Sequence, residues 1–184
     1  YQMHGRELND SEFVALPKEN IENAIERGLN SHHGIHYIKL HGSYGWRSSD
    51  GKNQLVIGTN KESLIKSEPL LRSYFELLRN AIGENDKKIL IIGYGFRDIH
   101  INNVLLKGVE DHNLKIYILS TQPPQELKLH LENFNIKING QGWVYSKGIW
   151  KGIRGYFPYS LKDFFPGNQE KTIHFEQLVA ALKS

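Results

Sequence analysis

Two short segments carry residues that could do chemistry, and the first is YIKLHGS. Its His41 and Gly42 follow an apolar segment that is typical of a β-strand. A histidine takes up and returns protons near neutral pH, and a glycine beside it leaves room for a bulky ligand. A lone histidine at the end of a strand is also common as a structural residue, so this segment alone leaves both interpretations open.

The second segment is GYGFRD, residues 93–98, which follows the apolar run ILII. Gly93 and Gly95 allow positive φ and a close approach by a ligand, and a helix N-terminus beyond them would offer free N–H groups. Asp98 could cap that helix or accept a hydrogen bond from a ribose hydroxyl. An ordinary tight turn with a capping aspartate would look the same, because two glycines are a weaker signal than a full dinucleotide fingerprint.

Two further segments favour a structural role. His32, His33 and His36 resemble a metal site, but no fourth ligand stands at a recognisable spacing, so we predict no metal. In residues 143–159 aromatic side chains alternate with Lys147, Lys151 and Arg154. Such a pattern can stack on single-stranded nucleic acid, but aromatic packing at a sheet edge or a subunit contact is the favoured interpretation.

The elements that must position these residues alternate between strand and helix. The apolar pattern predicts a helix after Leu16-Pro17 and strands over residues 35–40, 54–59, 89–93 and 115–120, the third of them central in its sheet. It also predicts a helix capped by Ser67 and running from Pro69 to Ile82, one beginning at Asp98, and two over residues 123–134 and 172–182. Short edge strands and loops are expected over residues 136–166. Alternating strands and helices predict an α/β fold with a parallel sheet.

Composition excludes several classes of protein. The 184 residues have a net charge of +3, which is too small to indicate nucleic acid, so we expect no nucleic-acid partner. They contain no cysteine, so no disulfide or thiolate zinc site can form. No apolar run reaches the roughly 18 residues of a membrane span. We therefore expect no membrane partner and a cytoplasmic location. The chain begins at Tyr1, so we also expect it to be interior to a longer protein.

The order of the two segments is more specific than either alone. YIKLHGS, a strand, a long helix and then ILIIGYGFRDIHIN closely resemble the sirtuin-like domain of bacterial proteins, in the divergent branch found in anti-phage defence effectors. The resemblance is good over residues 37–121. It implies a Rossmann-like, mostly parallel sheet with helices on both faces and NAD as the ligand.

The resemblance also implies the site residues. The LHG histidine of that family is catalytic and corresponds to His41, with Gly42 beside it in the cofactor site. The resemblance implies that the glycine turn lines the NAD pocket and that the end of the next strand lies near the adenosine. The helix after the turn usually carries a D-x-H-I-N segment in that family, here Asp98, His100 and Asn102. The implied binding residues are Gly93, Tyr94, Gly95, Phe96, Asp98, His100 and Ser120. The implied activity is hydrolysis of NAD with release of nicotinamide.

Departures from the family refine this expectation. Sirtuin deacylases bind zinc through cysteines, and their absence here implies the NAD-hydrolysing branch without zinc. The family's N-terminal glycine-rich turn and catalytic asparagine are not found before His41. We therefore expect residues 1–184 to form a single sirtuin-like domain lacking that half, with little activity as an isolated chain and with a homo-oligomer or partner domains completing it. A non-catalytic nucleotide sensor and a protein deacylase remain the alternatives.

Overall fold

The computed structural model describes residues 23, 38–47, 53–58, 60–133, 135–137, 143–145, 147–167 and 171–183. The chain forms two compact units, residues 1–79 and 80–184. The helix expected after Leu16-Pro17 lies outside the described residues except for Asn23, which is helical, and His32, His33 and His36 lie outside them too. Among the described residues, no helix is both long and apolar enough to cross a membrane. The expectation of a single domain stays a prediction.

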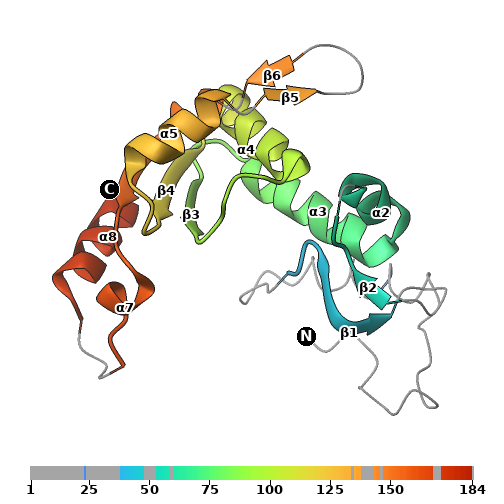
Figure 1. The fold of residues 1–184 in the computed structure, drawn as a ribbon, viewed down its shortest axis with the longest axis horizontal. Coiled ribbons are helices and arrows are strands. Elements are labelled where there is room, and N and C mark those ends of the chain that lie inside the picture. The colour runs from blue at the N-terminus through green and yellow to red at the C-terminus, as the bar shows by residue number, and fades with distance from the viewer. Residues whose placement is uncertain are drawn as a thin grey trace. The chain divides into compact units, whose positions relative to one another are not determined.

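The N-terminal unit contains a small antiparallel sheet, one whole helix and most of a second helix, which ends in the C-terminal unit. Strands β1 (Gly42–Arg47) and β2 (Asn53–Leu55) pair with each other, and helices α2 (Lys61–Ser67) and α3 (Pro69–Ile82) follow (Figure 1). The long helix is confirmed with Pro69 in its first turn, where its missing N–H costs nothing. Ser67, expected to cap it, instead ends α2 and donates its hydroxyl to the Leu64 carbonyl at 2.9 Å.

The strand predicted over residues 35–40 is wrong where the structure describes it. Residues 38 and 39 are irregular, Leu40 and His41 form a turn, and β1 begins only at Gly42. The apolar residues in this segment are explained by packing instead, because Ile38 and Leu40 contact a cluster formed by two residues of α3, Leu70 and Tyr74. The next predicted strand, over residues 54–59, is shorter than expected because β2 ends at Leu55.

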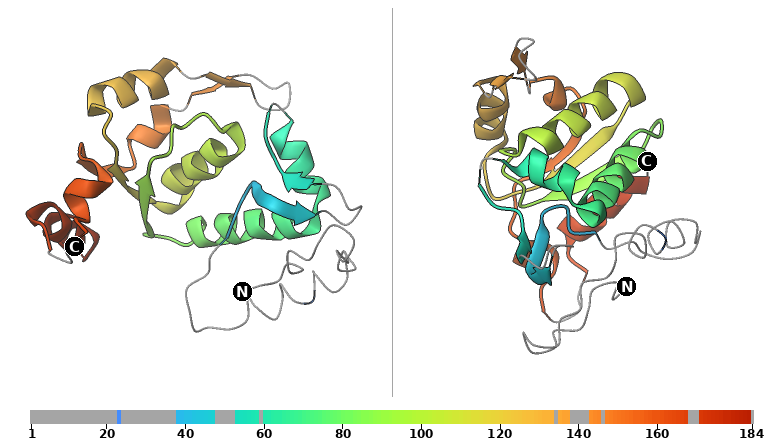
Figure 2. Two further views of the ribbon diagram at one scale, coloured as in Figure 1. Left: turned by 60° about the horizontal axis from the view of Figure 1, so that its bottom comes forward. Right: turned by 90° about the vertical axis from the view of Figure 1, so that its right-hand side faces the viewer.

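The C-terminal unit is built on a parallel sheet. Strands β3 (Lys88–Ile92), β4 (Lys115–Leu119) and β7 (Ile153–Phe157) lie side by side in the order β3-β4-β7 (Figure 2). Both β3 and β4 were predicted, but β4 rather than β3 is the central strand among the described residues. Burial agrees with this order, because four consecutive residues of β4 are buried whereas Ile92 of β3 is 43% exposed.

Helices cover both faces of this sheet. The two crossovers advance in the same direction, so their right-handed connections place α4 (Ile99–His112) and α5 (Pro124–Asn133) on one face. The short helix α6 (Lys147–Trp150) packs against both. On the other face, α7 (Leu161–Phe164) and α8 (Ile173–Lys183) pack Phe164 and Leu178 against Leu119. An α/β fold with a parallel sheet and helices is therefore confirmed.

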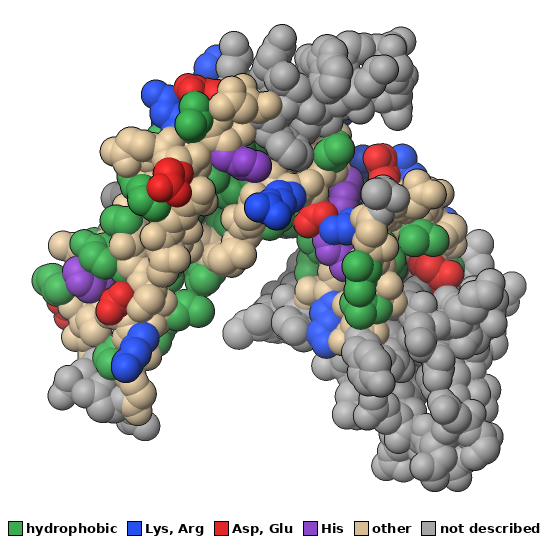
Figure 3. Space-filling view, viewed as in Figure 1, with side chains coloured by type: hydrophobic (Ala, Val, Ile, Leu, Met, Phe, Trp, Pro, Cys, Tyr) green, Lys and Arg blue, Asp and Glu red, His purple; other side chains and the backbone are tan. Residues whose placement is uncertain are grey.

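The described residues of the range 136–166, where short edge strands and loops were expected, contain short helices as well as strands. A hairpin of β5 (Asn135–Lys137) and β6 (Trp143–Tyr145) precedes α6, and β7 then joins the main sheet. The predicted aromatic packing is confirmed for Phe157 and Tyr159, whose rings lie 5.8 Å and 6.0 Å from that of Phe164. Figure 3 shows hydrophobic side chains at the surface over α7 and α8, where Phe165 is 51% exposed.

A capping box begins α7 and predicts a pH effect. Asp163 accepts hydrogen bonds from the Ser160 backbone N–H (2.8 Å) and hydroxyl (2.7 Å), and these bonds lower the pKa of Asp163. A lowered pKa means that the box stabilises α7 above the ordinary pKa of an aspartate and stops doing so as the pH falls through the lowered value. We expect Ser160→Ala to raise the pKa of Asp163 towards its ordinary value, measured by NMR titration of the carboxyl carbon. Ser73→Ala is the control, because the Ser73 hydroxyl donates to the Pro69 carbonyl and does not contact Asp163. An unchanged pKa of Asp163 in Ser160→Ala would show that the Ser160 hydroxyl does not lower that pKa.

Candidate functional site

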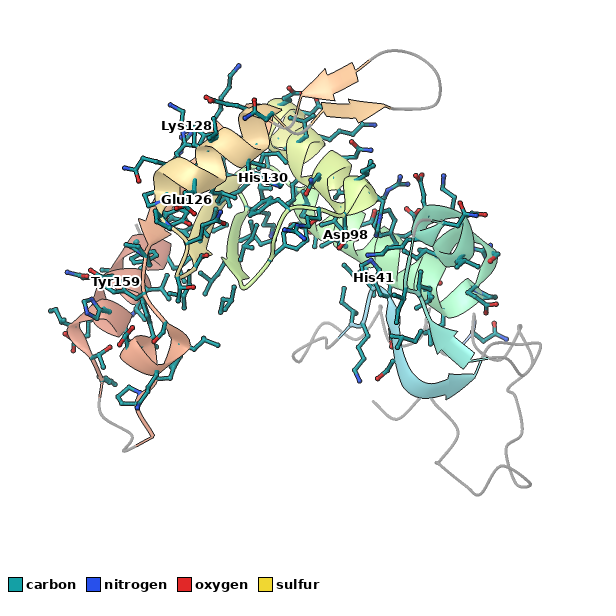
Figure 4. All side chains as sticks on the ribbon, viewed as in Figure 1. His41, Asp98, Glu126, Lys128, His130 and Tyr159 are labelled. Carbon is teal, nitrogen blue, oxygen red and sulfur yellow. The ribbon has the colours of Figure 1, made fainter. Side chains whose placement is uncertain are left out.

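The glycine turn, residues 93–98, connects β3 to α4 at the carboxyl end of the sheet (Figure 4 labels Asp98, where the chain enters α4). The backbone reverses through two residues with positive φ, Gly93 at +64° and Phe96 at +53°. A non-glycine residue in this conformation is uncommon and persists only when its surroundings hold it. The Phe96 side chain is completely buried and its ring lies 4.8 Å from that of Tyr94, so the interior holds the turn in place.

A single carboxamide ties this turn together. Asn102, in the first turns of α4, donates from Nδ2 to the Phe96 carbonyl at 2.8 Å. Its Oδ1 lies 2.9 Å from the Tyr94 hydroxyl, which donates to it and also lies 3.2 Å from the Asp98 carbonyl. The backbone N–H of Asn102 donates to the same Asp98 carbonyl at 2.9 Å. The side chain of Asn102 is 0% exposed, so its hydrogen-bonding groups are used inside the protein.

The outer surface of the turn is glycine backbone. Gly93 and Gly95 are both exposed, and a Cβ added to either would meet no atom within 4 Å. Open space beside exposed backbone is what a ligand needs for close approach. The predicted binding residues therefore divide into two groups, because Gly93 and Gly95 face this space whereas Phe96 and His100 are buried.

The structure shows the protonation state of Tyr94 and the hydrogen bonding of Asp98 at the start of α4. Burial, followed by the nearby charge of Asp98, raises the pKa of Tyr94, so its hydroxyl stays protonated and remains a donor over the whole working range of pH. Asp98 occupies the N-cap position of α4, but its side chain makes no capping hydrogen bond. The interpretation of the half-buried Asp98 as a residue that caps α4 through its side chain is therefore wrong.

Ser120 lies at the carboxyl end of the neighbouring strand. The Gly93 N–H donates to the Leu119 carbonyl at 3.4 Å, so the glycine turn and Ser120 leave adjacent strands at the same edge. The Ser120 N–H donates to Phe157 of β7 at 3.1 Å, and its hydroxyl accepts from the Gln122 N–H at 3.1 Å. Parallel α/β sheets bind their ligands at this edge, so the sheet brings together the predicted residues of the C-terminal unit.

His41 lies in the N-terminal unit, immediately before β1 (Figure 4). Gly42 donates its N–H to the Lys39 carbonyl at 3.0 Å and closes a β-turn in which His41 is the third residue. Val56 donates to the His41 carbonyl at 2.8 Å, and Gly42 has a φ of +75°, which only glycine adopts without strain. His41 thus sits on a turn fixed from both sides, and the expectation that it ends a strand is wrong.

Asn102 belongs to the D-x-H-I-N segment but is not among the binding residues predicted from the sequence. A signal for its role was present, since Asn102 follows Asp98 by four residues and so lies one helical turn beyond the cap. Among the described residues, His100 and Asn102 are the buried polar side chains, which is unusual for a helix face turned inwards. A buried asparagine at that spacing indicates a group that bonds back to the loop preceding the helix.

Comparison with known proteins gives one family. A profile of the SIR2-like domain matches residues 6–138. Neither a curated protein nor a solved structure gives a significant match. The matched range includes both His41 and the glycine turn, whereas β7, α7 and α8 lie beyond it. Because the match covers well over half of the 184 residues, the chain belongs to the SIR2-like domain family.

Proposed function

We propose that this chain is an NAD-hydrolysing domain that releases nicotinamide and acts in bacterial anti-phage defence by depleting NAD. Membership of the SIR2-like family implies an NAD-related, sirtuin-like function. The observation that carries the proposal further is the glycine turn, which is held by the hydrogen bonds of Asn102. Its exposed glycines border open space at the carboxyl end of β3. A dinucleotide needs such a surface, because its pyrophosphate and ribose must approach the backbone closely.

Each part of the site has a proposed task. The backbone at Gly93 and Gly95 receives the dinucleotide, and the Asp98 carboxylate accepts a hydrogen bond from a ribose hydroxyl. Ser120, on the adjacent strand, lies towards the adenosine. The buried residues Phe96 and His100 support this surface from behind.

The proposed reaction breaks the bond between the ribose C1′ and the nicotinamide nitrogen. The electron pair of that bond leaves with nicotinamide. The ribose passes through an oxocarbenium-like state, water adds to C1′, and one proton is released. His41 takes this proton, or orients the ribose hydroxyl or the water, as a histidine does near neutral pH. The products are nicotinamide and ADP-ribose.

One observation favours a second candidate, a module that senses a nucleotide without cleaving it. The accessible surface of the glycine turn consists of backbone, Arg97 and the half-buried Tyr94 and Asp98, and the histidine nearest in sequence, His100, is buried. Such a surface is suited to binding, but by itself it contains no exposed group that exchanges protons at neutral pH. The sensor would bind NAD and release no nicotinamide.

Gly95→Ala tests whether NAD uses this surface. Gly95 has no positive φ and open space around it, so alanine should leave the melting temperature unchanged. If bound NAD contacts the backbone at Gly95, the added methyl group should raise KM for NAD about 10-fold or more. One misplaced methylene in a binding site changes affinity by a factor of about 10 to 200. The measurement is nicotinamide release by the natural full-length protein over a range of NAD concentrations.

Gly167→Ala is the matched control, because Gly167 is also exposed and surrounded by open space, in the segment between α7 and α8. It should change neither KM nor the melting temperature. An unchanged KM in Gly95→Ala would remove the glycine turn from the NAD site. NAD binding without nicotinamide release in the wild type would support the sensor instead of the hydrolase.

A further inference from the structure

We propose that Asn102 is a positioning residue whose buried carboxamide fixes the shape in which the glycine turn meets its ligand. This inference rests on the proposed use of the turn for NAD. Asn102 is 0% exposed, so it cannot touch a substrate directly. Its effect has to pass through the two groups it bonds, the Phe96 carbonyl and the Tyr94 hydroxyl.

The carboxamide of Asn102 serves both groups at once. The Phe96 carbonyl needs a donor, which Nδ2 supplies at 2.8 Å, and the Tyr94 hydroxyl needs an acceptor, which Oδ1 supplies at 2.9 Å. An aspartate has the same shape but no N–H, so a carboxylate oxygen would face the Phe96 carbonyl. An apolar residue would leave the Phe96 carbonyl without its donor and the Tyr94 hydroxyl with only the longer bond to the Asp98 carbonyl at 3.2 Å. A buried carbonyl left without a donor costs more than the lost bond itself.

The two bonds lie on either side of Gly95. Tyr94 precedes this glycine and Phe96 follows it, so Asn102 holds the turn immediately before and after its most open point. Phe96 has a φ of +53°, a conformation that a phenylalanine leaves readily unless bonds and packing hold it. Without the carboxamide, Gly95 would present its backbone to a ligand in several conformations, and binding would lose the advantage of a preformed surface.

The two hydrogen bonds of the Asn102 side chain, to the Phe96 carbonyl and the Tyr94 hydroxyl, form a brace that does not depend on pH. Burial keeps the Tyr94 hydroxyl protonated, so the bond to Asn102 does not switch off with pH. The ring also contacts Phe96 at 4.8 Å between centroids, which joins the two bonded residues through their side chains. Tyr94→Phe therefore removes one bond of the brace and keeps the ring contact.

The test compares Asn102→Asp and Tyr94→Phe with Asn103→Asp in the natural full-length protein. Asn103 lies one residue further along the same helix, and its Oδ1 makes no hydrogen bond, so the control makes the same chemical change outside the brace. A positioning role predicts that both brace variants raise KM for NAD about 5- to 30-fold while kcat per folded molecule changes little, because a binding surface has become less ordered. A purely structural role would lower the folded fraction and leave KM unchanged. Asn103→Asp should keep the wild-type KM.

A second measurement does not depend on NAD. Arg97 is exposed within the glycine turn, so trypsin can cut after it when the turn opens. Cleavage after Arg97, followed by mass spectrometry, should become about 5-fold faster or more in Tyr94→Phe than in the control, because opening no longer breaks that bond. Unchanged cleavage in Tyr94→Phe would overturn the brace. Faster cleavage with an unchanged KM would overturn the positioning role. Absence of any NAD binding by the wild type would count against the proposed function, and the rate of cleavage after Arg97 would then still test whether the brace holds the turn.

Discussion

Replacing His41 by alanine should lower the rate of nicotinamide release about 10²- to 10⁴-fold, the usual contribution of a positioned acid–base group. The side chain leaves from a turn held by backbone bonds, from Gly42 to the Lys39 carbonyl at 3.0 Å and from Val56 to the His41 carbonyl at 2.8 Å. Both bonds use main-chain atoms, so alanine can keep them. The loss should therefore appear in kcat, with little change in the melting temperature.

The measurement is direct detection of nicotinamide with the natural full-length protein. His112→Ala is the matched control, because His112 is also half-buried but ends α4 beside Asn85. Equal turnover in His41→Ala and the wild type would show that another group moves the proton. A fall in kcat with a parallel fall in melting temperature would show that His41 supports the fold of the turn instead.

The largest effect on stability is expected at Gly152, where the chain enters β7. A Cβ at this position would overlap the Val109 side chain of α4 and lie 3.0 Å from the Leu114 carbonyl oxygen. The carbonyl belongs to the backbone leading into β4, so it cannot move aside without disturbing the sheet. We expect Gly152→Ala to reduce the free energy of unfolding by about 1–3 kcal/mol, the usual cost of overpacking. The melting temperature should fall by roughly 2–4 °C for each kcal/mol in a chain of this size.

Thermal unfolding followed by circular dichroism would measure this change. Gly167→Ala is again the control, since it introduces the same methyl group where no atom lies within 4 Å. A melting temperature equal to that of the control would mean that α4 and the segment before β7 are packed less tightly than the structure indicates.

Local apolar patterns predicted most helices and the first two parallel strands. In α3 the apolar residues repeat at helical spacing, and the runs KILII and KIYIL are apolar enough to be recognised as strands. Strand order was not predictable in this way, because two similar runs do not reveal which one has neighbours on both sides. Strand β7, with the sequence IRGYF, lacks such a run and is defined only by its pairing with β4.

The candidate site was predictable where the signal was local. The glycines at 93 and 95 indicated the turn and its exposed backbone. The brace by Asn102 depends on a hydrogen bond to a carbonyl six residues earlier, which the spacing of residue types does not specify. His41 was assigned to a strand end because Ile38 and Leu40 are apolar, but these residues are apolar because they contact α3.

The position of β7 has a practical consequence for experiments that truncate this protein. The range shared with the SIR2-like family ends at residue 138, whereas β7 spans Ile153–Phe157 and pairs with β4 from Ile116 to Leu119. A polypeptide cut at the family boundary would leave the most buried strand of the sheet with an open edge, and open apolar edges recruit strands from other molecules. Aggregation of such a fragment would reflect a missing strand and would say nothing about the chemistry of the family.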